Sequence, residues 1–193
     1  MTAEYSLVLR GGTVVDGSGG APREADVAIS GRRIAAVGKV AGSGREEIDA
    51  RGLIVTPGFV DIHTHYDAQA TWTGRIQSSS NNGVTTALIG NCGVGFAPCR
   101  PEKRDALVKL MEGVEDLPEV VLTEGLPWNW ESFPDYLDAL AARQYDLDIA
   151  AQVTHAALRV FVMGDRAEAH ADSTAEDRAE MARLAAEGIR AGP

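Results

Sequence analysis

Positive charge is in short supply in this sequence, and its scarcity excludes classes of partner. The chain has 18 Lys and Arg against 28 Asp and Glu, which gives a formal net charge of -10. Binding to nucleic acid or to an anionic membrane surface requires clustered Lys and Arg that neutralise phosphates. We therefore expect neither nucleic acid nor a membrane among the partners.

Long apolar runs are also missing. No stretch approaches the roughly 20 consecutive apolar residues of a membrane-spanning helix. Residues 1–6 lack the basic start and apolar core of a secretory signal. Cysteine is limited to Cys92 and Cys99, and free thiols without a signal peptide are typical of a reducing compartment. Together these absences predict a cytoplasmic protein.

Residues 1–55 consist of short apolar runs separated by glycine. The runs with strand character are 6–10, 13–15, 25–29 and 34–37, and Ile48 continues the pattern. Ser30-Gly31-Arg32 is typical of a hairpin turn between the last two runs. Such a unit buries too small a core to be stable alone. We expect it to pack against another structure.

Residues 56–193 contain both strand-like and helical segments. The strand-like runs are 59–63, 84–89 and 147–153, and the helical segments are 101–114, 132–143 and 173–190. This order predicts parallel strands and an α/β architecture. Pairs that resemble capping boxes, Ser132 with Asp135 and Ser173 with Glu176, mark the starts of the last two helices.

In the last of these helices we expect the apolar positions Met181, Leu184, Ala185 and Ile189 to face inward. The acidic residues Glu176, Asp177 and Glu180 are expected to form a solvated face. The sequence then stops at Pro193, where the alternation predicts a further strand. A complete eight-stranded barrel needs about 250 residues, and about three βα units fit here. We interpret residues 56–193 as the first part of a TIM-type barrel, from a truncated chain.

The run Asp61-Ile62-His63-Thr64-His65 is the strongest candidate for chemistry. Side chains two residues apart on a strand share a face, so His63 and His65 are expected to lie together with Asp61. Neutral imidazole is a good zinc ligand, and α/β barrels place their active sites at the carboxyl ends of strands. The alternative is a pair of hydrogen-bonded histidines without a metal.

Cys92 follows the next predicted strand, in Gly90-Asn91-Cys92-Gly93. A thiolate is a soft, negative ligand that suits zinc and can bridge two ions. Taken alone, Cys92 is more simply a small buried hydrophobe, as free cysteines usually are. The histidine pair on the neighbouring strand makes the ligand interpretation the better one. Cys99 has no such context, and we expect it to be structural.

The run from Pro57 to His65 resembles the first barrel strand of the amidohydrolase superfamily, and Gly83-Val84-Thr85-Thr86 resembles the second. Gly90-Asn91-Cys92-Gly93 is similar to the N-acyl-D-amino-acid deacylase (D-aminoacylase) branch. In that branch a cysteine replaces the carboxylated lysine that bridges the metals of dihydropyrimidinase-like relatives. The resemblance covers nearly the whole chain and implies that residues 1–55 belong to a small β-sandwich domain.

This resemblance implies a zinc-dependent hydrolase of linear amide C–N bonds, with one or two Zn²⁺ ions held by His63, His65 and Cys92. The implied substrate is a small N-acyl-D-amino acid. Two further histidines and the aspartate that acts as general acid and base are expected beyond residue 193. Asp61 lies on the first strand and cannot take that role, so we expect the chain alone to be inactive.

Two alternatives stay open. One is a dihydropyrimidinase or another amidohydrolase of cyclic amides, which would need a bridging lysine. None of Lys39, Lys103 and Lys109 ends a predicted barrel strand, although a lysine on the absent fourth strand would restore this alternative. The other is a non-catalytic remnant that only binds metal.

Four further residues lie near the motifs. His155, after the third strand, is expected to be packed or on the substrate side and not to be a ligand. Asp67 either orients a histidine from behind or is a solvated loop residue. Trp128 and Trp130 are expected to pack a long loop against the barrel, with a substrate wall as the lesser alternative.

Overall fold

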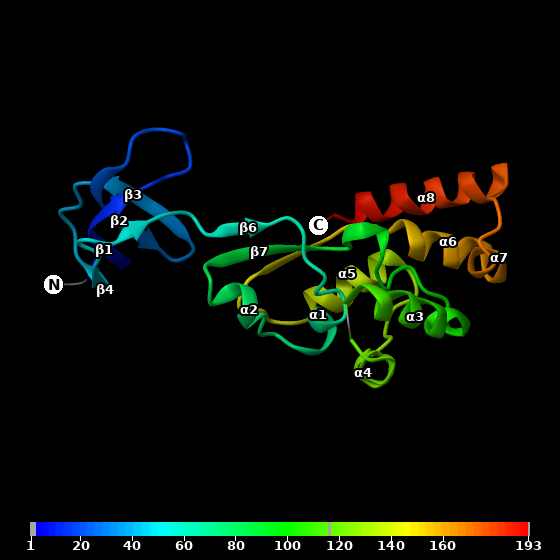
Figure 1. The fold of residues 1–193 in the computed structure, drawn as a ribbon. Coiled ribbons are helices and arrows are strands. Elements are labelled where there is room, and N and C mark those ends of the chain that lie inside the picture. The colour runs from blue at the N-terminus through cyan, green and yellow to red at the C-terminus, as the bar shows by residue number, and fades with distance from the viewer. Residues whose placement is uncertain (1–2, 116, 193) are drawn as a thin grey trace. The chain divides into compact units, whose positions relative to one another are not determined.

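The computed structural model describes residues 3–115 and 117–192. The chain forms two compact units, Met1–Gly58 and Phe59–Pro193 (Figure 1). Within the described residues, no helix has both the length and the apolar character needed to cross a bilayer.

The first unit is a five-stranded sheet. Its strands are β1 (Tyr5–Val14), β2 (Arg23–Ser30), β3 (Arg33–Gly38), β4 (Gly44–Asp49) and β5 (Ile54–Val55). The order is β3-β2-β1-β4, and β5 pairs with the far end of β1. Its buried cluster consists of Val8, Ala28 and Val40, which is as small a core as the sequence predicts.

Two glycines shape this sheet. Ser30 pairs with Arg33, so the predicted hairpin is confirmed, and Gly31 adopts the φ of +59° that its turn requires. The prediction of separate strands on either side of residues 11–12 was wrong. Gly11 has a φ of +64°, and the register of β1 shifts there, so the glycine makes a bulge in one continuous strand.

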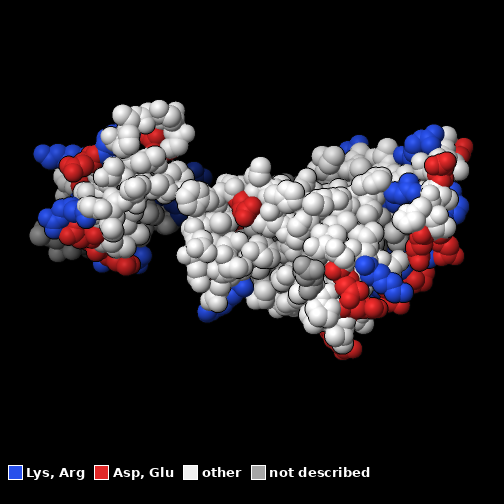
Figure 2. All heavy atoms as spheres, in the orientation of Figure 1, with Lys and Arg blue, Asp and Glu red and all other residues white. Residues whose placement is uncertain are grey.

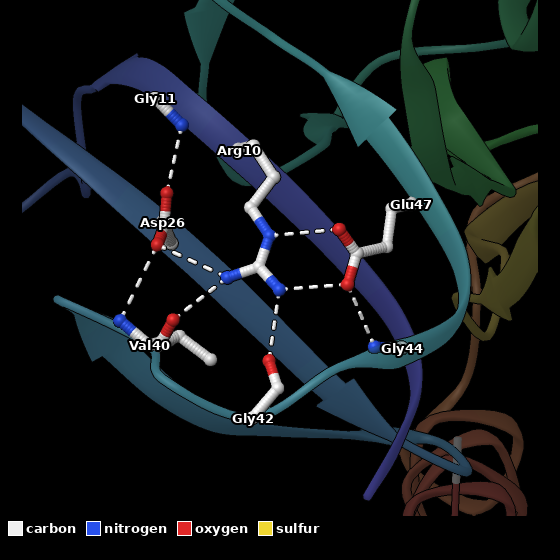
Figure 3. A network of polar contacts seen from close by, with 7 residues as sticks. All are labelled: Arg10, Gly11, Asp26, Val40, Gly42, Gly44 and Glu47. Atoms are coloured by element: carbon white, nitrogen blue, oxygen red, sulfur yellow. Dashed lines mark hydrogen bonds and ion pairs between the residues drawn. The ribbon is translucent and has the colours of Figure 1, made fainter. Parts of the chain in front are cut away.

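Arg10 on β1 joins four segments of this unit (Figure 3). Its guanidinium donates two hydrogen bonds to the Glu47 carboxylate, at 2.7 and 3.1 Å, and one to Asp26 at 3.3 Å. It also donates to the carbonyl oxygens of Val40 and Gly42, at 2.7 and 2.8 Å. Arg10 is the main cause that lowers the pKa of Glu47 to about 2. One half-buried cation thus holds the β3–β4 connection against β1 and β2.

The second unit contains a three-stranded parallel sheet in the order β6-β7-β8. The strands are β6 (Phe59–Asp61), β7 (Val84–Ile89) and β8 (Asp148–Ala151). The predicted α/β class is confirmed, whereas the partial barrel stays a prediction. On the face shown in Figure 2, the middle of this unit carries few charged side chains. Phe59, Val60 and Ile62 are exposed apolar residues on and just after the edge strand β6.

Helices connect and cover this sheet. They are α1 (Gln69–Trp72), α2 (Gln77–Ser80), α3 (Arg104–Glu115), α4 (Glu119–Gly125), α5 (Phe133–Ala141), α6 (His155–Met163), α7 (Asp165–Glu168) and α8 (Ala175–Ala191). The predicted helices correspond to α3, α5 and α8, and α8 packs against α5 and α6 (Figure 1). The helix α6 was not predicted from the sequence.

The start of α5 is as predicted, and the start of α8 is not. Ser132 and Asp135 form the expected capping box. At α8 the box is formed by Thr174 and Asp177, one residue later than predicted. The Asp177 carboxylate accepts from the Thr174 N–H at 2.8 Å and from the Arg166 guanidinium at 2.6 and 2.9 Å. Asp177 is therefore buried, which corrects the prediction that it lies on a solvated face.

The inward face of α8 also differs from the prediction. Ile189 is 76% exposed, and the neighbouring Gly188 is buried instead. A Cβ atom on Gly188 would lie 2.5 Å from Val153 Cγ2 and 2.9 Å from Phe133 Cδ1. Close approach at this glycine sets the rotation of α8, and it turns Ile189 outward.

The core of the second unit is aromatic at its centre. The Trp130 indole N–H donates to the Phe96 carbonyl at 2.8 Å, and its ring lies edge-on to Tyr136 with centroids 4.9 Å apart. Trp128 lies 5.8 Å from Phe96 in the same geometry. The prediction that the two tryptophans pack their loop is confirmed.

Candidate metal centre

The segment that carries the two histidines begins where β6 ends. The strand stops at Asp61, so the prediction that it runs through His63 was wrong. The Asp61 carboxylate accepts from the His63 N–H at 3.1 Å and forms a local turn there. Thr64 then returns to the sheet, because its N–H and hydroxyl both donate to the Leu88 carbonyl, at 3.2 and 2.9 Å. This buried threonine anchors the histidine on either side of it.

The turn that carries Cys92 follows β7. Gly90 and Cys92 both have positive φ, +83° and +54°, a conformation that residues with a Cβ rarely adopt. The buried Asn91 side chain holds this turn. Its amide group donates to the carbonyls of Leu88 at 2.7 Å and Thr64 at 3.0 Å, and its Oδ1 accepts from Gln152 at 3.0 Å. Asn91 therefore ties together the ends of all three strands.

These two segments bring three potential metal ligands together. One ligand atom from each of His63, His65 and Cys92 lies within 4.8 Å of the others, and the described residues contain no other such cluster. His63 Nε2 lies 3.3 Å from Cys92 Sγ, and the two imidazole rings are 5.5 Å apart at an angle of 62°. The cluster lies at the carboxyl ends of neighbouring parallel strands.

The donor atoms suit a zinc ion. Two nitrogens and one thiolate sulfur are ligands that zinc accepts in a tetrahedral site with one open position. A nitrogen and a sulfur bound to one tetrahedral zinc ion lie about 3.5 to 3.6 Å apart, which is close to the distance of 3.3 Å between His63 Nε2 and Cys92 Sγ. Burial, followed by the proximity of His63, lowers the pKa of His65, and this favours the neutral imidazole that binds metal. The Nδ1 atom of His65 is buried without a hydrogen-bond partner among the described residues.

Asp67 follows the histidine segment, two residues after His65. It is 2% exposed, so the interpretation of a solvated loop residue was wrong. Burial raises the pKa of its carboxyl to about 7, against the opposing effect of hydrogen bonds from the backbone N–H groups of Gly90 and of Asp67 itself. The Oδ2 atom has no hydrogen-bond partner among the described residues. Among the described residues, no hydrogen bond joins this oxygen to a histidine ring.

Two other predicted residues lie apart from the ligand cluster. His155 is exposed at the first position of α6, so it is not packed in the core. A Cβ atom on Gly93 would lie 3.7 Å from the His155 Cβ, which places His155 beside the loop that carries Cys92. Cys99 is buried, and burial raises the pKa of its thiol to about 12, as expected of an inert structural cysteine.

The sequence analysis did not predict that Asn91 and Gln152 take part in the candidate site. The position of Asn91 directly before Cys92 was the available signal, because a buried amide at a strand end often satisfies backbone carbonyls. Gln152 offered no signal, since its partner lies 61 residues away in the sequence.

The second unit is thus an α/β structure that carries a nitrogen and sulfur donor cluster at the carboxyl ends of its parallel strands. Metal-dependent α/β enzymes place their ligands in this way. A sequence profile of the amidohydrolase family matches residues 46–193, and the chain belongs to this family.

Proteins similar to this chain include a D-aminoacylase and N-acyl-D-amino-acid deacylases. A D-aminoacylase from Alcaligenes xylosoxydans xylosoxydans is 37% identical over 189 residues, which are 97% of this chain and 36% of that protein. A solved structure of a D-aminoacylase is 34% identical to this chain with a TM-score of 0.78, over 97% of this chain and 37% of the other. That structure concerns the binuclear metal centre of the D-aminoacylase, with activation by one metal and attenuation by the second. The N-acyl-D-glutamate deacylase of Bordetella bronchiseptica, solved with zinc and a phosphonate inhibitor, is 31% identical with a TM-score of 0.80, over 96% of this chain and 36% of the other.

The predicted resemblance to the D-aminoacylase branch is therefore confirmed, and the chain has the mixed α/β fold of the matching part of these proteins. The chain spans little more than a third of the length of these relatives.

Proposed function

We propose that this chain forms the first part of a zinc-dependent hydrolase of linear amide bonds, whose substrates are N-acyl-D-amino acids. The observation that carries the proposal is the convergence of His63, His65 and Cys92 within 4.8 Å at the strand ends. The similarity to D-aminoacylase and to N-acyl-D-glutamate deacylase supports the substrate class.

His63, His65 and Cys92 would hold one or two zinc ions, with the Cys92 thiolate able to bridge a pair. A bound zinc ion supplies a water of lowered pKa and polarises the carbonyl of the scissile amide. The chain's own contribution is to orient the ligands. Thr64 anchors the two histidines, and Asn91 holds the turn that presents the thiol.

The partial barrel and the small β-sandwich belong to the same proposal. The edge strand β6 and the residue after it expose Phe59, Val60 and Ile62, at 63%, 62% and 70%. Large apolar side chains exposed on an edge strand are typical of a surface that other protein covers. Both β6 and β8 are edge strands, as the first and third strands of an incomplete parallel barrel would be.

Zinc content after equilibration of the metal-free chain tests the site. We expect His63→Ala and Cys92→Ala each to lower the bound zinc. The matched control is His155→Ala, which removes an exposed imidazole close to the site but outside the cluster and should retain the zinc. Full zinc binding by both ligand variants would refute the assignment.

A separate assay tests activity. We expect the 193-residue chain alone to be inactive toward N-acetyl-D-amino acids, because two histidines and the catalytic aspartate are expected outside it. Turnover by a metal-replete, monomeric preparation would contradict this expectation. Zinc binding without turnover by a longer chain that completes the barrel would instead favour the non-catalytic alternative.

A further inference from the structure

Tyr66 directly follows the proposed ligand His65, and the proposed reaction gives its hydroxyl group no role. The side chain of Tyr66 packs against two buried clusters of the second unit. Its hydroxyl oxygen lies 2.8 Å from the hydroxyl oxygens of both Ser78 and Ser79, on helix α2. A phenylalanine would fill the same place in the core without these hydrogen bonds. The hydroxyl group therefore needs an explanation beyond packing.

The helix that bonds to this hydroxyl is itself fixed at both ends. The Asp146 carboxylate, two residues before β8, accepts from the Ile76 N–H at 2.9 Å and from the Ser80 hydroxyl at 2.7 Å. These two residues lie at the start and the end of α2. Ser79 is 6% exposed, so water competes little for its hydroxyl group. The Tyr66 hydroxyl is thus bonded to a helix that is tied to the segment before the third strand.

The orientation of His65 depends on the residues on either side of it. A metal-binding histidine is usually oriented by a hydrogen bond at its second ring nitrogen. The Nδ1 atom of His65 is buried without a partner among the described residues, so no bond at this atom orients the ring. Before His65, the backbone is fixed by Thr64, which donates twice to the Leu88 carbonyl. After it, Tyr66 is held by its hydroxyl contacts with α2 and by its carbonyl, which accepts from the Ala70 N–H at 2.8 Å.

We propose that Tyr66 is a positioning residue of the metal centre. Its hydroxyl group, held by α2, fixes the backbone after His65 and so directs this imidazole at the other two ligands. The inference rests on the proposed zinc site. It assigns Tyr66 no contact with metal or substrate, because Tyr66 acts through His65.

Cobalt substitution of the full chain tests this role. Cobalt(II) bound to a thiolate gives a near-ultraviolet charge-transfer band, and its visible bands report tetrahedral coordination. Tyr66→Phe keeps the ring in the core and removes only the hydroxyl group. We expect this variant to bind cobalt about 3- to 10-fold more weakly, since one hydrogen bond that orders a site changes an equilibrium constant by about this factor. Its visible bands should weaken, whereas the charge-transfer band, which reports Cys92, should persist.

Two further variants separate positioning from stability. Tyr145→Phe is the matched control, because the Tyr145 hydroxyl donates to the Ala70 carbonyl at 2.7 Å, four residues further along the same segment. It should lower the melting temperature and leave the cobalt affinity and the visible bands unchanged. Ser79→Ala removes the buried partner of Tyr66 and should weaken cobalt binding in a chain that still folds. The variant with both Ser79→Ala and Tyr66→Phe should bind cobalt as Tyr66→Phe does, because the two changes remove the same hydrogen bond.

The inference is overturned if folded Tyr66→Phe keeps the wild-type cobalt affinity and visible bands, and Ser79→Ala decides the question in the same way if Tyr66→Phe does not fold. It is also overturned if Tyr145→Phe weakens cobalt binding as much as Tyr66→Phe does, because the loss would then follow stability. Failure of the underlying site has a different signature. In that case the wild-type chain itself gives no charge-transfer band, and Cys92→Ala binds cobalt as the wild type does.

Discussion

Replacing Asn91 with alanine tests how the strand ends hold the candidate site. Asn91 is 8% exposed and directly precedes Cys92. Its side chain donates to the Leu88 and Thr64 carbonyls and accepts from Gln152, at 2.7, 3.0 and 3.0 Å. The alanine variant loses all three hydrogen bonds and leaves a small cavity between the ends of β6, β7 and β8.

The expected magnitude follows from these bonds. Each hydrogen bond contributes about 0.5–1.5 kcal/mol net, and a buried carbonyl left without its donor costs more than one that water can reach. The Gln152 side chain is exposed and can bind water instead, so its bond counts least. We expect Asn91→Ala to lower the free energy of unfolding by about 2–4 kcal/mol.

Tryptophan fluorescence during urea denaturation measures this change in the second unit, which contains all three tryptophans of the chain. Asn82→Ala is the matched control. The Asn82 side chain also donates to a backbone carbonyl, that of Ser78 at 2.9 Å, but it is exposed. Its loss should change the free energy of unfolding by no more than about 0.5 kcal/mol. If Asn91→Ala also changes it by less than about 0.5 kcal/mol, Asn91 does not hold the strand ends together.

Three shorter predictions concern the rest of the chain. A thiol reagent should label Cys92 but not Cys99 in the folded, metal-free protein, and equal labelling would contradict the burial of Cys99. Arg10 lowers the pKa of Glu47, so the ion pair stabilises the fold above pH 4.5, and this stabilisation is lost as the pH falls toward 2. The first unit of Arg10→Met lacks the pair at every pH, so circular dichroism should show a smaller loss of structure over this range for the variant than for the wild type. Thr174→Ala should lower the free energy of unfolding, measured by calorimetry, by about 1 kcal/mol, whereas Ser173→Ala should leave it almost unchanged. A larger loss for Ser173→Ala than for Thr174→Ala would support the capping box predicted from the sequence.

Local physics explains which parts of the fold were predictable. The hairpin at Gly31 depends on a turn of two residues, and the capping box at Ser132 depends on residues three apart. The alternation of strands and helices after residue 58 likewise follows from periodicity within each segment. Interactions between residues a few positions apart depend on the local sequence alone, so the sequence predicts them directly.

The wrong predictions lie where distant residues decide between similar local choices. Ser173 and Thr174 are both favourable N-cap residues, and the pairing of Asp177 with Arg166, 11 residues away, selects Thr174. The side of α8 that faces inward is set by close approach to Val153 and Phe133 at Gly188, which turned Ile189 outward.

The candidate metal centre shows the same division. The sequence by itself determined the identity of the three potential ligands and their places after two predicted strands, because strand period and residue chemistry are local properties. Only the tertiary structure decided that His63 and His65 lie beyond their strand and that Cys92 approaches His63 at 3.3 Å. The physical reason is that buried polar groups hold these segments together: Asn91 reaches Thr64, 27 residues away, and Gln152, 61 residues away. Such bonds depend on which strand ends meet, and that is settled only when the sheet forms.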